Sequence, residues 1–179
     1  AECIYCGMMT DTGGFTFNSN NPEIYLIISL LLRKGVDKDR IYSLVYNNLT
    51  EDRFRLLGFT LSQRMKVYPE LHTALIWLSL EDQKQFRYNK GDTEGFVNYP
   101  LSIKDIIFSV FIREEEEMVK LSFRSQGSFP TNEFAAQFFQ GGGHLNASGG
   151  EFFGSLSDAL ARFEEGVAHY ADKLRSISR

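Results

Sequence analysis

Residues 138–152 read FFQGGGHLNASGGEF, and the interpretation of the whole chain starts from this stretch. Gly141, Gly142 and Gly143 lack Cβ atoms, so their backbone can take positive φ and direct several N–H groups at one point. A turn of this kind is a nest for an anion. His144 follows directly, and its imidazole can donate a hydrogen bond to a phosphate oxygen or pass a proton near neutral pH.

The same glycines also have a purely structural interpretation. Gly141 would end the preceding helix, and the other glycines would form a tight turn into a strand. Glycine content alone favours this second interpretation. A further cluster of small residues, residues 147–150, includes Ser148 and lies next to the first.

A β-hairpin is expected before this stretch. Residues 106–113 and 118–124 read as strands around the acidic turn at residues 114–117. The second strand alternates, which directs Lys120, Ser122 and Arg124 to one face and apolar residues to the other. An arginine at a strand end is typical of a surface ion pair, but beside a glycine nest and a histidine its planar fork suits a phosphate.

Two motifs together resemble a known family. The strand KLSFRS at residues 120–125, followed by GGGHLNASGG at residues 141–150, resembles the signature of the DHH-associated domain. MTDTGGF at residues 9–15 resembles the last motif of the catalytic DHH domain. The two matches occur in the right order and cover nearly the whole chain, and they are most similar to small bacterial oligoribonucleases and pAp phosphatases.

The resemblance implies an α/β chain in two parts. Residues 1–68 would be the end of a parallel-sheet DHH catalytic domain with a connector helix over residues 50–68, which Pro69 ends. Residues 69–179 would be a smaller mixed-sheet α/β DHH-associated domain that binds substrate. In the first part, the continuous apolar run at residues 3–9 predicts a buried parallel strand.

The resemblance also implies roles for particular residues. Asp11 would be a catalytic residue and a manganese ligand, and a carboxylate suits that ion. The alternative is an aspartate that caps its own turn. His144 would be catalytic as well. The substrate phosphate would be bound by Arg124, Ser125, Gly141, Gly142, Gly143, His144 and Ser148.

The sequence departs from the family pattern at its metal motifs. Asp-His-His is absent, since the histidines are His72, His144 and His169, and Asp-x-Asp is missing from its proper setting. The full-length enzyme would hold two manganese ions, but one aspartate cannot assemble a two-metal site. The start at Ala1 suggests a fragment. We therefore predict that this chain alone binds no manganese, binds nucleotide phosphate weakly and has no phosphoesterase activity.

Composition restricts the partners. The 179 residues are 43% hydrophobic, enough for one sizeable core or two small ones, and the net charge of −4 argues against a broad electrostatic surface for long nucleic acid. Short single-stranded RNA or small nucleotides are the expected ligands. Cys3 and Cys6 are expected to be reduced thiols, no membrane segment is apparent, and a cytoplasmic location follows. The sequence leaves a homodimer open.

A second function belongs to another class. The DHH-associated domain also occurs as a non-catalytic appendage that binds RNA or nucleotides. In that role basic residues would line the face that carries residues 141–144, and RNA would bind without metal. The acidic net charge speaks against this role, and Asp11 within its motif favours the enzyme.

Overall fold

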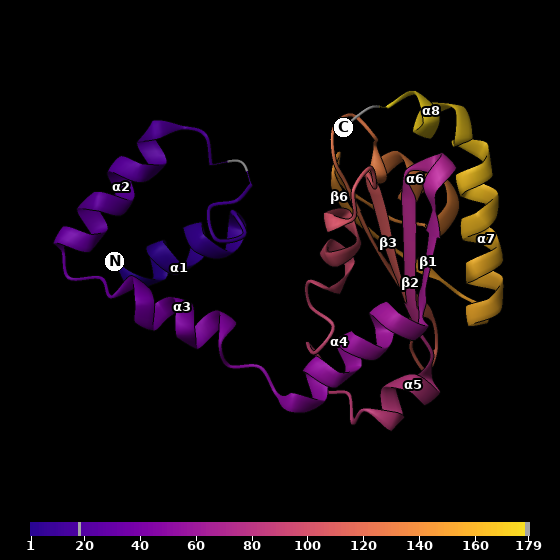
Figure 1. Cartoon of the computed structure of the whole chain (residues 1–179), viewed down its shortest axis with the longest axis horizontal. Helices are drawn as coiled ribbons and strands as arrows, with labels where there is room; N and C mark the ends of the chain where they lie inside the picture. Colours follow the sequence, from indigo (N-terminus) through magenta and orange to yellow (C-terminus); the bar gives the residue numbers. More distant parts are fainter. Residues whose placement is uncertain (18, 178–179) are drawn as a thin grey trace. The chain divides into compact units, whose positions relative to one another are not determined.

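The computed structural model describes residues 1–17 and 19–177, which divide into two compact units, Ala1–Thr50 and Glu51–Arg179. Figure 1 shows the helices of the first unit and the sheet of the second.

The first unit is built from three helices around a small core. They are α1 (Glu2–Asp11), α2 (Pro22–Arg33) and α3 (Lys38–Tyr46). Asp37 caps α3 by accepting a hydrogen bond from the Arg40 amide, and Gly35 follows α2 with a φ of 86°. The core consists of Tyr5, Met9, Leu31, Val36 and Ile41.

The prediction of a strand at residues 3–9 is wrong, because these residues lie in helix α1. Tyr5 and Met9 are one helical turn apart and are both buried, whereas Ile4, the residue before Tyr5, is 58% exposed. A short apolar run does not distinguish a buried strand from a helix by its pattern. Among the described residues of this unit there is no strand.

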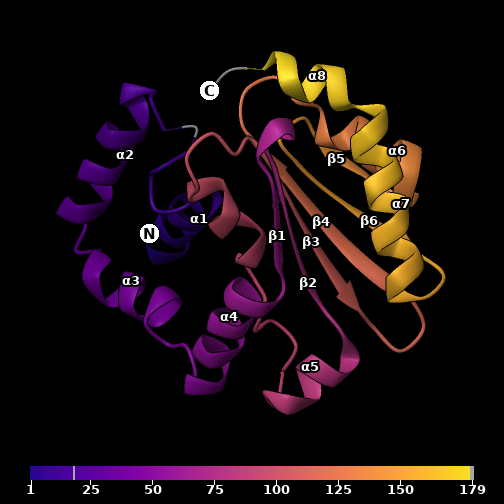
Figure 2. The ribbon, with the colours of Figure 1, turned by 45° about the vertical axis from the view of Figure 1, so that its right-hand side comes forward.

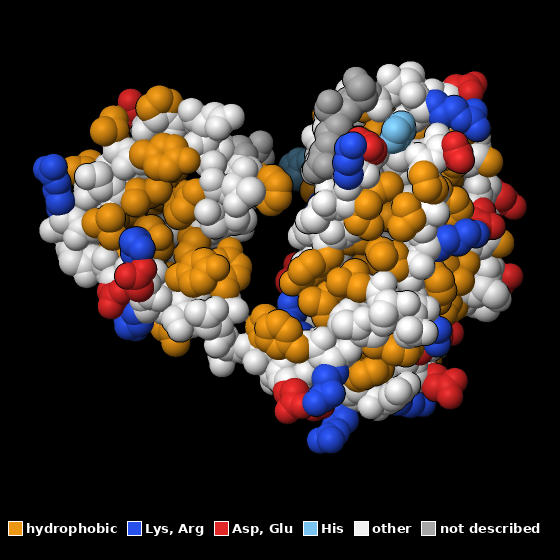
Figure 3. Space-filling view, viewed as in Figure 1, with side chains coloured by type: hydrophobic (Ala, Val, Ile, Leu, Met, Phe, Trp, Pro, Cys, Tyr) orange, Lys and Arg blue, Asp and Glu red, His pale blue; other side chains and the backbone are white. Residues whose placement is uncertain are grey.

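Much of the first unit's apolar surface is not buried by its own core. Figure 3 shows hydrophobic side chains gathered on the visible surface of this unit. On α2, large side chains remain more than one-third exposed: Tyr25, Leu26, Ile27, Leu30 and Leu32. Only Leu31 of this helix is buried.

The second unit contains one mixed six-stranded sheet with the strand order β1-β2-β3-β4-β6-β5. Strands β2 and β3 are parallel, and all other neighbours are antiparallel. The predicted mixed-sheet α/β domain is confirmed. The strands are β1 (Met65–Tyr68), β2 (Thr73–Leu78), β3 (Phe108–Glu114), β4 (Val119–Ser125), β5 (Gly142–His144) and β6 (Ala147–Phe152).

Helices cover the two faces of this sheet differently. On one face, α6 (Thr131–Phe139) and α7 (Leu156–His169) pack over the main core, which includes Phe108, Phe123 and Phe134. On the other face, α4 (Glu51–Gln63) and the 3₁₀ helix η2 (Phe96–Ser102) cover the β2–β3 half through a second core. Figure 2 shows α6 and α7 on one side of the strands and α4 on the other.

The expected connector helix is shorter than predicted. Helix α4 ends at Gln63, and the next residues form strand β1, which pairs with β2. Leu56 of α4 is fully buried against Ile76 and Leu78 of β2. The two units therefore divide at residue 50, whereas the predicted boundary lay at residue 68.

The chain after β4 forms one helix, two short strands and two C-terminal helices. Helix α6 begins at Thr131, although the Thr131 hydroxyl bonds the carbonyls of His144 and Leu145 instead of capping the helix. Ser155 and Asp158 form a capping box at the start of α7. The final helix is interrupted at Tyr170, and α8 (Ala171–Ser176) follows. The remaining elements are η1 (Pro69–Leu71) and α5 (Leu80–Gln85).

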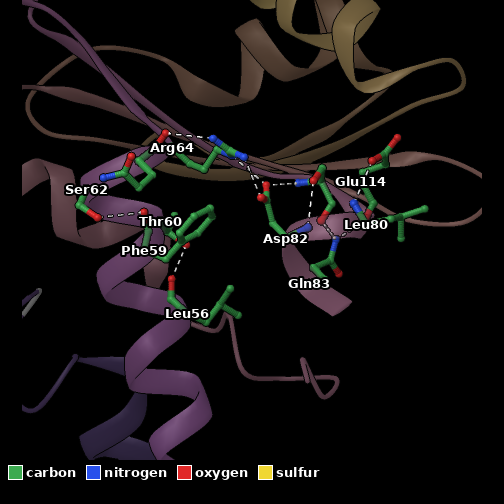
Figure 4. Close-up of polar contacts among 11 residues, drawn as sticks. Leu56, Phe59, Thr60, Ser62, Arg64, Leu80, Asp82, Gln83 and Glu114 are labelled. Atoms are coloured by element: carbon green, nitrogen blue, oxygen red, sulfur yellow. Dashed lines mark hydrogen bonds and ion pairs between the residues drawn. The ribbon is translucent and has the colours of Figure 1, made fainter. Parts of the chain in front are cut away.

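A partly buried ion pair holds the junction of α4 and α5 (Figure 4). Arg64, which follows α4, donates two hydrogen bonds to the Asp82 carboxylate, at 2.9 and 2.8 Å. Burial raises the pKa of Asp82, but hydrogen bonds from Arg64 and Ser79 outweigh it and hold the pKa below its ordinary value. Glu114 accepts from the Leu80 amide at 2.9 Å, which ties the end of β3 to α5.

Candidate functional site

The site is built on the half of the sheet that α4 and η2 leave uncovered. Strand β4 alternates as the sequence predicts, with Leu121 and Phe123 buried in the α6–α7 core. Lys120, Ser122 and Arg124 consequently point to the opposite face. Strand register extends this face to β6 and β5.

Arg124 and His144 belong to the same row of this face. Arg124 pairs with Ala147 of β6, which pairs with His144 of β5. Paired residues on neighbouring strands have side chains on the same face. Two strand spacings, about 10 Å, separate the two backbones, and only a methyl group lies between them.

The next row has almost no side chains. Ser122 pairs with Gly149, and Gly149 pairs with Gly142. The following row returns to charged residues, since Lys120 pairs with Arg113 of β3 on one side and Glu151 of β6 on the other. The face is therefore a flat floor of small residues with basic groups at both ends.

A cavity of about 450 Å³ lies over this floor. One wall comes from the loop that precedes η2, through Glu94 and Gly95, and this loop is held by Arg53 of α4, which donates to the Glu94 carbonyl at 2.7 Å. The cavity is lined by Thr93, Glu94, Gly95, Val97, Phe111, Arg113, Lys120, Leu121, Ser122, Arg124, Gln140, Gly141, Gly149, Gly150 and Glu151.

Arg124 is the half-buried cation of this cavity. Its guanidinium donates one hydrogen bond, 2.9 Å long, to the carbonyl of Phe123. Over residues 1–17 and 19–177, no ion pair joins it to a carboxylate. Burial lowers the pKa of Arg124, and Glu94 opposes this effect at longer range. A desolvated guanidinium without a carboxylate partner is suited to an incoming anion.

The expected nest of amides at residues 141–143 is not formed. Gly142 and Gly143 belong to strand β5, and only Gly143 of the three has a positive φ, 144°. Successive N–H groups of a strand point in opposite directions and cannot converge on one anion. The structural interpretation of the glycines is closer to the observed conformation, with Gln140 in the left-handed C-cap position.

Close packing explains why glycine occupies several of these positions. A Cβ at Gly141 would lie 2.0 Å from the Gly149 carbonyl oxygen, and one at Gly150 would lie 2.8 Å from the Phe139 Cβ. A Cβ at Gly142 would meet nothing within 4 Å. The glycines allow β5 and β6 to approach each other and α6 closely, which shapes the cavity floor.

The predicted site residues are only partly brought together. Arg124 and Gly141 line the cavity, and His144 is exposed on the same face. Ser125 and Ser148 lie on the opposite face. The Ser125 hydroxyl donates to the Phe129 carbonyl at 2.7 Å, and the Ser148 hydroxyl is buried without a hydrogen-bond partner among the described residues. Neither hydroxyl reaches the cavity, because adjacent strand residues alternate faces.

Asp11 is the last residue of helix α1 in the first unit and is exposed. The position was predicted to follow a strand, so this part of the prediction is wrong. Among the described residues, no group of three or more His, Cys, Asp and Glu side chains could hold a metal ion. The residues described here therefore do not fit a two-manganese site.

Sequence reasoning assigned no binding role to two basic residues of the cavity, Arg113 and Lys120. Arg113 donates to the Thr93 hydroxyl at 2.9 Å and to Glu115 at 2.5 Å, and its guanidinium also bonds the Tyr88 hydroxyl. The alternation of apolar and polar residues in the hairpin was the sequence signal that could have identified them. It places Lys120 on the face of Arg124, and the antiparallel pairing brings Arg113 next to Lys120.

The fold and this cavity define an α/β domain with a cavity lined by Arg113, Lys120 and Arg124 on an open sheet face. Residues 72–171 match the family model described as the DHHA1 domain, and the chain belongs to this family. No helix in the described part of the chain is long and apolar enough to cross a bilayer.

Curated relatives carry related names. The chain is 30% identical over 168 residues to the bifunctional oligoribonuclease and PAP phosphatase NrnA of Thermus thermophilus, covering 93% of this chain and 49% of the relative. It is 26% identical over 153 residues to the Bacillus subtilis protein of the same name, covering 86% and 47%. The chain thus spans about half the length of the curated relatives it matches.

A solved structure is similar over the same extent. The exopolyphosphatase-related protein of Bacteroides fragilis is 60% identical with a TM-score of 0.94, and the match covers 98% of this chain and 51% of that one.

Proposed function

We propose that this chain is the substrate-binding part of a phosphoesterase that hydrolyses short oligoribonucleotides or small nucleotides such as pAp and di-adenylates. The observation that carries the proposal is Arg124, a half-buried guanidinium that faces a cavity and has no carboxylate partner among the described residues. The names of the relatives support the substrate class. A cytoplasmic location is part of the proposal.

In the proposed complex, a terminal phosphate lies against Arg124, with His144 at the other end of the same row. The guanidinium would donate two parallel hydrogen bonds to phosphate oxygens, which fixes both the position and the orientation of the group. The imidazole of His144 would donate a further hydrogen bond. The flat floor at Gly149 and Gly142 would accept the sugar or base without steric conflict. Orientation of the scissile bond by such remote contacts contributes to the rate.

Manganese belongs to the proposal for the full-length enzyme only. Asp11 would be one ligand, and the other ligands would have to come from residues outside those described. The ions would supply Lewis acidity and an activated water. We expect the 179-residue chain alone to bind nucleotide without manganese and to release no phosphate.

Binding of pAp by wild type and by Arg124→Gln tests the proposal in isothermal titration calorimetry without metal. Loss of charge-assisted hydrogen bonds of about 1.5–3 kcal/mol predicts binding that is about 10- to 100-fold weaker. Arg175→Gln is the matched control, because Arg175 is exposed on α8 and pairs with Asp172. Unchanged affinity of Arg124→Gln would refute the proposal.

Two further measurements separate the expected roles. Phosphate release from pAp with manganese by the isolated chain, lost in Asp11→Ala, would contradict the expected inactivity. Metal-independent binding of long single-stranded RNA as tight as that of pAp would favour the non-catalytic binding module.

A further inference from the structure

The second basic end of the cavity has a different construction from the first. Arg113 and Lys120 lie side by side on β3 and β4, and they line both the cavity over the small-residue floor and a neighbouring cavity of about 590 Å³. The neighbouring cavity adds three exposed basic side chains, Lys84, Arg87 and Lys90, and the acidic residues Glu115, Glu116 and Glu117. Basic side chains therefore continue beyond the floor at its Lys120 end, the end opposite Arg124.

Glu115 occupies the junction of the two cavities. One carboxylate oxygen accepts from Arg113 at 2.5 Å, and the other lies 3.5 Å from the Lys120 ammonium. The Lys120 side chain is 47% exposed, so this longer pair is screened by solvent and weak. Arg113 is held more firmly, since it also bonds Thr93 and Tyr88. Lys120 is thus a weakly engaged cation beside a fixed one.

The distance between the two ends restricts the ligand. Lys120 and Arg124 are four positions apart on one strand, which corresponds to about 13 Å along β4. The two phosphates on a single ribose are closer together than this, and so are successive phosphates of an RNA chain. A ligand that reaches both ends must therefore carry at least one further phosphate between its two bound phosphates.

On the basis of the proposed function, we propose that Lys120 and Arg113 form a second phosphate subsite, which oligoribonucleotides of three or more nucleotides occupy and pAp does not. The backbone phosphate displaces the Glu115 carboxylate from Lys120, while Arg113 keeps its contacts with Thr93 and Tyr88. Glu94 and Glu151, the other acids on the cavity wall, disfavour additional negative charge elsewhere along the floor. The subsite therefore selects ligands by length.

Binding of a 5′-phosphorylated adenosine trinucleotide and of pAp tests the subsite in Lys120→Ala. We expect trinucleotide binding to weaken about 2- to 5-fold, with pAp affinity unchanged. The slope of log affinity against log salt concentration should fall by about 0.7 for the trinucleotide, as for the loss of one single-strand phosphate contact. Lys173→Ala is the matched control, because Lys173 belongs to α8 and lines neither cavity.

Glu115→Gln provides a test in the opposite direction. Its amide oxygen can still accept from Arg113, but the charge that competes for Lys120 is gone, so trinucleotide binding should tighten and pAp binding should stay the same. The subsite proposal would be overturned if Lys120→Ala changed the affinities for both ligands equally, or changed neither affinity. If Arg124→Gln binds neither pAp nor the trinucleotide while Lys120→Ala binds both normally, the proposed function stands and only the subsite is refuted.

Discussion

Alanine in place of Gly141 should damage the second unit, whereas alanine at the adjacent Gly142 should not. A Cβ at Gly141 would lie 2.0 Å from the Gly149 oxygen and 2.7 Å from the Gly150 Cα, and side chains essentially never approach this closely. Both neighbours are backbone atoms, so a change of rotamer cannot relieve the contact. Strand β6 or the end of α6 must move.

The magnitude follows from two opposing effects. Overpacking costs about 1–3 kcal/mol, and the upper end applies here because backbone must shift. Alanine also restricts the unfolded chain, which recovers about 0.4–1 kcal/mol. Gly141→Ala should therefore lower the free energy of unfolding by about 2 kcal/mol and the melting temperature by about 4–8 °C. Gly142→Ala meets no atom within 4 Å, so its stability should equal or slightly exceed that of wild type.

Urea unfolding followed by tryptophan fluorescence measures this difference directly. Trp77 is the single tryptophan of the sequence and lies in β2, so its signal reports on the sheet of the second unit. Equal unfolding midpoints for Gly141→Ala and Gly142→Ala would refute the argument that close backbone approach requires glycine at residue 141.

Two other predictions concern the polar contacts of the second unit. Asp82→Asn should cost about 2 kcal/mol, because it weakens the paired hydrogen bonds from Arg64, whose side chain is 35% exposed. Burial raises the pKa of Asp82, but hydrogen bonds from Arg64 and Ser79 hold it below its ordinary value. The ionised Asp82 therefore stabilises the folded state fully above the unfolded-state pKa of about 4. This contribution to the free energy of unfolding is lost as pH falls through the lower folded-state pKa. Urea titrations from pH 6 to pH 2.5 should show this loss in wild type and a smaller one in Asp82→Asn; parallel curves would contradict it. Ser155→Ala should cost about 1 kcal/mol by removing the cap of α7, measured by thermal melting, and an unchanged melting temperature would show that the cap adds nothing.

The hairpin of β3 and β4 was predictable because its signal is local. A clean alternation of apolar and polar residues fixes both the strand and its faces, and it correctly placed Arg124 on the face away from the core. The capping box at Ser155 and the glycine after α2 are local signals in the same sense. These patterns do not depend on distant parts of the chain.

Other features depended on tertiary contacts that the sequence pattern does not reveal. The run at residues 3–9 could have packed as a strand or a helix, and burial of Tyr5 and Met9 decides for the helix. Strand β1 was missed because pairing with β2 outweighs the helical pattern that precedes it.

The glycine-rich segment shows how a correct motif can suggest the wrong geometry. Three glycines permit a nest of backbone amides, but pairing of β5 with β6 holds the backbone of Gly142 and Gly143 in an extended strand instead. Ser148 therefore points away from the cavity, and His144 reaches the face of Arg124 by strand register and not by a turn. Arg113 needed the pairing of β3 with β4, which places it beside Lys120.

A crystal structure of the chain with pAp bound would test the central claim most directly. A phosphate oxygen should lie about 2.8 Å from a guanidinium nitrogen of Arg124, within the cavity floored by Ser122 and Gly149. A nucleotide bound elsewhere on the second unit, with the Arg124 guanidinium still bonded only to the Phe123 carbonyl, would contradict the account.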